Sequence, residues 1–162
     1  MAGGQRTDDT DGRLKFQWYL QVVTPDGAVK VADIVECDYP KAKVDVVQRG
    51  APGKNHKIKK PGMISFEDVK FKMVMPTIGA NHVLWNWLMR AANPVTGRAT
   101  PAPNLRRKSI LFHIDDVGST IEKFEFHKSW ISELGGEKHE ASSEYQYEEG
   151  TLTYDYYTRV AG

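Results

Sequence analysis

Strict alternation of apolar and polar residues at the start of the chain is its strongest structural signal. Between Leu14 and Val23, the even-numbered residues are Leu, Phe, Trp, Leu and Val, and the intervening ones include Lys, Gln, Tyr and Gln. A period of two places successive side chains on opposite faces of a strand, so one face is expected to be buried and the other hydrated. Thr24-Pro25-Asp26-Gly27 has turn-forming residues, and Ala28–Glu36 is expected to return as the second strand of a hairpin.

Further segments show strand-like apolar patterns. They are Ile64–Met75, Arg106–Asp116, Phe124–Trp130 and Ser143–Val160, the last of which is rich in tyrosine. In the first of them the apolar residues change parity at Glu67-Asp68, which indicates a β-bulge.

The two middle segments are expected to form a hairpin closed by Asp116-Val117-Gly118. Their apolar faces are predicted to hold Ile110, Phe112 and Ile114 from the first strand and Phe124, Phe126 and Trp130 from the second. The opposite parity carries His113 and His127, which we expect to form an exposed cross-strand pair.

Six or seven antiparallel strands with short turns favour a sandwich or a small barrel, and we predict an antiparallel β-barrel of the mainly β class. A chain of 162 residues is expected to form one domain, here residues 14–162 after a flexible polar tail at 1–13. Asp38–Pro61 is polar, basic and punctuated by glycine and proline. We therefore predict a long basic loop there, with at most a short strand at Val44–Val47.

Asn81–Ala92 is the segment with helical spacing, with Asn81 as N-cap and Asn93-Pro94 as its end. Its apolar residues form two stripes: Val83, Leu84, Trp87, Leu88 and Ala91, and then Trp85, Met89 and Ala92. Such a helix is expected to be buried on nearly all sides, whereas one barrel face covers a single stripe. The second stripe is covered either by the loop 95–104 or by another subunit, for which Trp85 and Met89 are the candidate contacts.

Composition excludes several classes of function. The chain has 22 lysines and arginines against 21 acids, a net charge of +1, whereas a dedicated nucleic-acid binder usually has a clear basic excess. No apolar run approaches the roughly 20 residues of a membrane span, so the monomer is not expected to insert into a membrane. Cys37 is the single cysteine, which excludes an internal disulfide and a Cys-based zinc cluster. No histidine spacing fits a metal site. We therefore predict that the chain has no catalytic, metal-binding or cofactor-binding residues and that it is not an enzyme.

The charges are distributed unevenly along the chain. Lys41–Gly62 carries seven basic residues against Asp45, a net +6, and Glu133–Glu149 carries six acids against Lys138, a net −5. These segments are either two solvated loops or complementary patches that let identical copies dock head-to-tail. The candidate contacts of the second interpretation are Arg49, Lys54, Lys57, Lys59, Lys60, Glu137, Glu140 and Glu144.

Five motifs follow one another from about Lys60 to the C-terminus. They are Lys60-Pro61-Gly62 before the strand at Ile64, Leu84-Trp85-Asn86-Trp87 in the helix, Ser109–Ile114 with the acidic turn Asp115–Gly118, Phe124–Trp130, and Gly150–Tyr154. Their order and spacing resemble the tail tube proteins of contractile-tail bacteriophages and the inner-tube proteins of contractile injection systems. The tyrosine-rich C-terminal segment and Ile131–Gly136 depart from the family pattern.

The resemblance implies a β-barrel subunit that forms hexameric rings, which stack into a tube inside a contractile sheath and provide a conduit for DNA or effector proteins. Its partners would be further copies of itself, sheath and baseplate proteins, and cargo bound without sequence specificity. It would be assembled in the bacterial cytoplasm and work in a virion tail or an injection particle. The departures leave a tube-initiating baseplate adaptor or a tube-capping paralogue as alternatives. From the residues alone, a monomeric barrel that binds a small ligand is the competing class.

Overall fold

The computed structural model describes residues 18–24, 27–74, 83–91, 93–98, 101, 105–115, 118–136 and 147–161. Its elements are β1 (Trp18–Thr24), β2 (Gly27–Cys37), β3 (Ala42–Gly50), β4 (Lys57–Phe66), β5 (Val69–Val74), α1 (Val83–Ala91), β6 (Arg107–Ile114), β7 (Thr120–Gly136), β8 (Tyr147–Thr153) and β9 (Tyr156–Ala161). The predicted tail at 1–13 lies outside the described residues.

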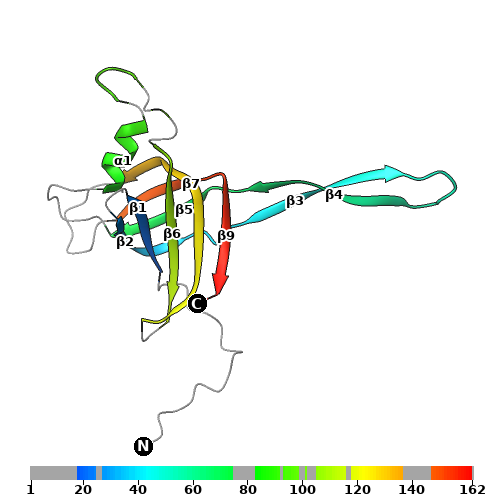
Figure 1. The fold of residues 1–162 in the computed structure, drawn as a ribbon, viewed down its shortest axis with the longest axis horizontal. Coiled ribbons are helices and arrows are strands. Elements are labelled where there is room, and N and C mark those ends of the chain that lie inside the picture. The colour runs from blue at the N-terminus through cyan, green and yellow to red at the C-terminus, as the bar shows by residue number, and fades with distance from the viewer. Residues whose placement is uncertain are drawn as a thin grey trace, which may run out of the picture.

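The strands close into an antiparallel barrel, as predicted. The sheet order is β6-β1-β2-β5-β8-β7-β9, and a further pairing of β6 with β7 joins the sheet to itself. β7 is long enough to pair with β8 near its C-terminal end and with β9 nearer its start, so β9 continues the line of β8 along the same neighbour. The closed wall therefore has six strands, and β9 extends it beside β7 (Figure 1).

The barrel interior is filled by apolar and aromatic side chains from every wall strand. Trp18, Leu20 and Val22 of β1 are buried, which confirms the alternation of the opening segment. The predicted hairpin turn after β1 is also present, because Thr24 pairs with Gly27, whose φ of +126° favours glycine. Phe124 and Phe126 of β7 are fully buried in the same core.

The predicted buried face of β6 is wrong. Ser109, Leu111 and His113 point inward, and Ile110, Phe112 and Ile114 lie on the half-exposed side. The inward polar groups have polar partners, since Ser109 Oγ lies 2.6 Å from Ser129 Oγ and His113 Nδ1 lies 3.4 Å from Glu122 Oε1. The His113 ring also stacks on that of Trp18, with centroids 4.2 Å apart.

The expected pairing of His113 with His127 is wrong as well. His113 is opposite Glu122 and His127 is opposite Tyr156. A bulge with Lys128 at a φ of +54° changes the parity of β7, so Trp130 does not share the buried face of Phe126.

The predicted loop at Asp38–Pro61 is also wrong, because most of it is a β-hairpin. β3 and β4 form a separate two-stranded sheet that projects from the barrel (Figure 1). We call residues 42–66 the arm. The expected single bulged strand at Ile64–Met75 is instead divided between arm and barrel, and the parity change at Glu67-Asp68 marks the point where the chain passes from one to the other. The strand suggested at Val44–Val47 lies inside β3.

The predicted helix is present as α1. Leu84 and Trp87 are buried, and the Trp87 indole N–H donates a 2.7 Å hydrogen bond to the carbonyl of Leu105. Trp85 of the second stripe is 47% exposed, so this stripe is not buried within the single chain and its cover by another subunit stays a prediction. The described part of the following loop, residues 93–98, is itself exposed.

Candidate assembly surfaces

The arm exposes apolar side chains along its whole length. They are Val44, Val46, Val47, Ile58, Met63 and Ile64, with Met63 80% and Val46 60% exposed. Both faces of a two-stranded sheet are open to solvent when it projects from the barrel. Exposed apolar groups concentrated on such an element are typical of a surface that another molecule covers.

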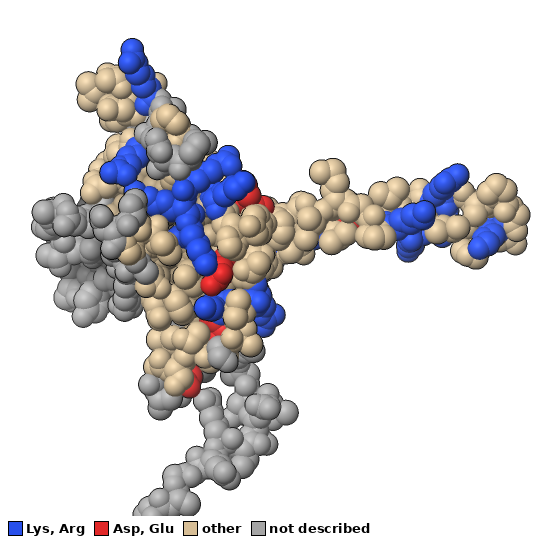
Figure 2. All heavy atoms as spheres, viewed as in Figure 1, with Lys and Arg blue, Asp and Glu red and all other residues tan. Residues whose placement is uncertain are grey.

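The arm also carries a net positive charge. Arg49, Lys57, Lys59 and Lys60 lie on its strands and Lys54 lies in the connecting turn, all exposed. No acid occurs between residues 46 and 66, so this stretch carries +5, and subtraction from the chain total of +1 leaves −4 for the rest. Figure 2 shows the blue side chains of the arm gathered in its outer half. The five predicted basic contacts therefore share one projecting element.

The two predicted helix contacts lie away from the arm. Trp85 is exposed on α1, and Met89 is half-buried on the same helix. In Figure 1, α1 and the arm extend from different sides of the barrel. When one patch of a subunit contacts the other patch of the next copy, the interface is heterologous, or head-to-tail, and such an interface closes into a ring or continues as a stack.

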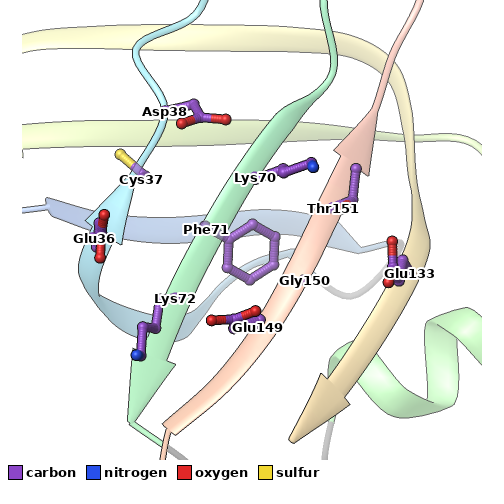
Figure 3. Close-up of a pocket in the computed structure, with 10 residues that line it drawn as sticks. All are labelled: Glu36, Cys37, Asp38, Lys70, Phe71, Lys72, Glu133, Glu149, Gly150 and Thr151. Carbon is purple, nitrogen blue, oxygen red and sulfur yellow. The ribbon is translucent and has the colours of Figure 1, made fainter. Parts of the chain in front are cut away.

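The predicted acidic contacts Glu137, Glu140 and Glu144 lie outside the described residues. Their flanking neighbours Glu133 and Glu149 line a pocket of about 250 Å³ in the barrel wall (Figure 3).

The pocket is formed by β2 and the residue after it, β5, β7 and β8. Its charged side chains are Glu36, Asp38, Glu133 and Glu149, with Lys70 and Lys72 between them. Four carboxylates against two ammonium groups give the lining a net charge of −2. Glu133 and Glu149 belong to the acidic run that is visible in the sequence, whereas Glu36 and Asp38 reach the pocket only through the register of β2 against β5.

Gly150 forms part of the pocket wall beside Phe71 (Figure 3). The Phe71 ring occupies the space that a side chain at position 150 would need. A Cβ at this position would lie 2.6 Å from Phe71 Cζ and 3.2 Å from Leu134 Cδ1. We expect Gly150→Ala to lower the free energy of unfolding by about 1–3 kcal/mol, measured in urea, because the buried Phe71 must shift. Gly135→Ala is the matched control, since nothing lies within 4 Å of its Cβ position. Equal stability of the two variants would contradict the expectation.

Cys37 also lines the pocket, but its chemistry is unfavourable for catalysis. Burial, reinforced by the carboxylates of Asp38 and Glu36, raises the pKa of its thiol to about 12. The thiolate that a nucleophile requires is therefore scarce at neutral pH. In the part of the chain that the structure describes, no group of three or more His, Cys, Asp or Glu side chains could hold a metal ion.

The two ends of the arm are fastened to the barrel by the tyrosine-rich C-terminal segment. The Tyr157 hydroxyl donates to the carbonyl of Pro40 at 3.3 Å, just before β3. The Tyr154 hydroxyl donates to the carbonyl of Glu67 at 2.6 Å, just after β4. Phe66, the last residue of the arm, packs against both tyrosine rings. The tyrosine content of this segment was visible in the sequence, but its role was not.

The family model for the T4-like virus tail tube protein gp19 matches residues 14–158. The chain belongs to this tail tube family. No curated protein sequence matches it significantly.

Solved structures with the same fold come from contractile injection systems. A chain of an extracellular contractile injection system, the PVC sheath–tube complex in the extended state, aligns with a TM-score of 0.72 and 12% identity over 100% of both chains. A chain of the anti-feeding prophage baseplate aligns with a TM-score of 0.72 and 7% identity over 93% of this chain and 96% of that one. A chain of the anti-feeding prophage tube-terminating cap aligns with a TM-score of 0.70 and 13% identity over 99% and 100%.

The tail tube family and these structural neighbours are structural tube proteins and not enzymes. Among the described residues of this tail tube family member, no helix has the length and apolar character needed to cross a membrane.

Proposed function

We propose that the chain is the structural subunit of an inner tail tube, and that it forms hexameric rings which stack into a conduit for DNA or effector proteins. The observation that supports this most directly is the arm, a hairpin of exposed valines and cations held outside a barrel that is already closed. Its surface is suited to a partner rather than to the core of its own chain. Sheath and baseplate proteins would surround the tube, and assembly would take place in the bacterial cytoplasm.

The competing classes differ in what they require of the barrel. A small-ligand barrel needs an internal cavity, whereas this interior is packed with rings such as Trp18, Phe124 and Phe126. A tube-initiating adaptor or a cap would share the fold, and the baseplate and cap neighbours keep both as alternatives. The purified chain discriminates among them in negative-stain images: a main tube subunit extends into tubes, whereas an initiator or cap stops at one ring.

The arm of one copy would dock on the acid-lined pocket of the next. With +5 on residues 46–66 and −4 on the rest of the chain, neighbouring copies attract through arm and barrel. The barrel face visible in Figure 2 carries many lysines and arginines and would repel an incoming arm. The pocket wall, with Glu133 and Glu149, is the complementary surface, and the segment with Glu137, Glu140 and Glu144 connects its two strands.

Charge reversal on each side of this contact is the sharpest test. Lys57→Glu, Lys59→Glu and Lys60→Glu together, or Glu133→Lys with Glu149→Lys, would each place like charges opposite one another. Each set is expected to raise the protein concentration needed for tubes by roughly tenfold, about 1.4 kcal/mol, as measured by sedimentation and negative-stain imaging. Combining the two sets restores opposite charges and is expected to restore assembly.

The control for the pocket variant is Glu125→Lys with Asp155→Lys, two acids outside the pocket whose reversal raises the net charge by the same four units. Tubes of unchanged length and salt resistance in the arm variant would contradict the electrostatic contact. If assembly fails in the arm variant but not in the pocket variant, the arm still takes part in a subunit contact, but the acid-lined pocket is not the surface that it binds.

A further inference from the structure

The arm leaves the barrel through two short connections, and the C-terminal segment contacts both. Tyr157 binds the backbone before β3 and Tyr154 binds the backbone after β4, so one segment spans the whole base of the arm. Glu67 N–H also donates to the carbonyl of Lys41 at 3.2 Å, which ties the two connections to each other. A hinge at this base would have to break hydrogen bonds on both sides.

A buried carboxylate adds a third fixed point. Glu122 of β7 is 2% exposed, and Arg159 of β9 binds its Oε2 through Nε at 2.8 Å and through a terminal nitrogen at 2.6 Å. The Tyr39 hydroxyl, close to the start of the arm, donates to the same carboxylate at 3.2 Å. The hydrogen bond that Arg159 donates to Glu122 raises the pKa of the Arg159 guanidinium above its ordinary value.

The aromatic rings at the base are packed as well as hydrogen-bonded. Tyr157 lies edge-on to Phe66 of the arm and to Phe124 of the barrel, with ring centroids 5.4 and 5.8 Å apart. Tyr39 lies edge-on to Phe124 at 5.2 Å. The base of the arm is therefore continuous with the barrel core, although the rest of the arm is exposed.

We propose that the C-terminal segment, residues 154–159, holds the arm in one fixed direction in the isolated subunit. Tyr154 and Tyr157 fasten its two connections, and Arg159 holds Glu122 where Tyr39 can bind it. The arm is then oriented before it meets a partner. An element already fixed in its bound direction loses less conformational freedom on docking, which favours assembly. This last step rests on the proposed tube function, whereas the fixed direction does not.

Distances measured by electron paramagnetic resonance in dilute monomer test the proposal. Spin labels are placed at Lys54→Cys in the arm turn and Lys123→Cys on β7, in a chain that also carries Cys37→Ser. The parent is expected to give one narrow distance distribution. In Tyr154→Phe with Tyr157→Phe, which removes both hydroxyls and keeps the rings, the width of the distribution is expected to at least double.

Tyr147→Phe with Tyr156→Phe is the matched control. It removes one hydroxyl from β8 and one from β9, where the Tyr147 ring lies under Lys72 and the Tyr156 ring stacks on His127. Thermal unfolding verifies that each variant retains the barrel. An unchanged width in the Tyr154/Tyr157 variant, or equal broadening in the control, would overturn the proposal.

Imaging the same variants separates this proposal from the tube function. If the parent forms no tubes, the proposed function fails and the distance measurement still decides whether the arm is fixed. If the Tyr154/Tyr157 variant has a broader distance distribution but forms tubes at the parent's concentration, the tube function is retained. A contribution of the fixed arm to assembly is then rejected.

Discussion

Replacing Arg159 with leucine is expected to lower the free energy of unfolding by about 3–5 kcal/mol, because it leaves the buried Glu122 without its cation. Glu122 is 2% exposed and both of its contacts with Arg159 are shorter than 3 Å. Tyr39 and His113 remain beside the carboxylate but at 3.2 and 3.4 Å, and Tyr39 is a neutral donor. Urea unfolding of monomeric protein measures the difference.

Two controls separate the buried charge from a general effect of losing an arginine. Arg106→Leu removes the 3.3 Å pair with Asp155, whose partners are 39% and 44% exposed, and is expected to cost less than about 1 kcal/mol. Arg159→Leu combined with Glu122→Leu removes both charges and is expected to recover most of the loss. If Arg159→Leu costs no more than Arg106→Leu, the Glu122 contact does not stabilise the fold.

The barrel and the helix could be predicted because each has a buried side opposite a wet one. β1 alternates strictly, and α1 repeats its apolar residues at helical spacing, so the periodicity of a single segment was enough. The arm lacks this signal. Both of its faces are exposed, and valines and lysines occur on each of them. Gly50, Pro52 and Pro61 are residue types that are common in loops, so the segment does not show the pattern of a strand.

The inward face of β6 was missed for a different reason. Ser109 and His113 are polar, and each is buried because of a partner on another strand: Ser129 for the serine, Trp18 and Glu122 for the histidine. One strand's pattern cannot reveal such pairs.

The same limit applies to the candidate surfaces. The basic residues were found as a run along the chain, and the exposure of Trp85 agrees with its spare apolar stripe. The pocket and the base of the arm combine residues more than 80 positions apart, as in the contact between Tyr39 and Glu122. Only the register of the closed sheet brings these groups together.

Substitution of the two tryptophans of α1 is expected to have different effects, because Trp87 lies in the core and Trp85 lies on a candidate assembly surface. Trp87 is 1% exposed and its indole N–H binds the Leu105 carbonyl at 2.7 Å, so Trp87→Ala is expected to cost about 3–5 kcal/mol. At about 2–4 °C per kcal/mol for a chain of this length, the melting temperature should fall by roughly 6–20 °C.

Trp85→Ala makes the same chemical change two residues earlier, on the side of α1 that is 47% exposed. The monomer is expected to lose less than about 1 kcal/mol, since surface substitutions outside special features have small effects. Assembly should suffer instead, because an exposed tryptophan that becomes buried between copies is typically a dominant contact. Calorimetry of the monomer and sedimentation of assembled protein measure the two effects separately. Tubes that form at the parent's concentration in Trp85→Ala would exclude this helix face from the subunit contacts.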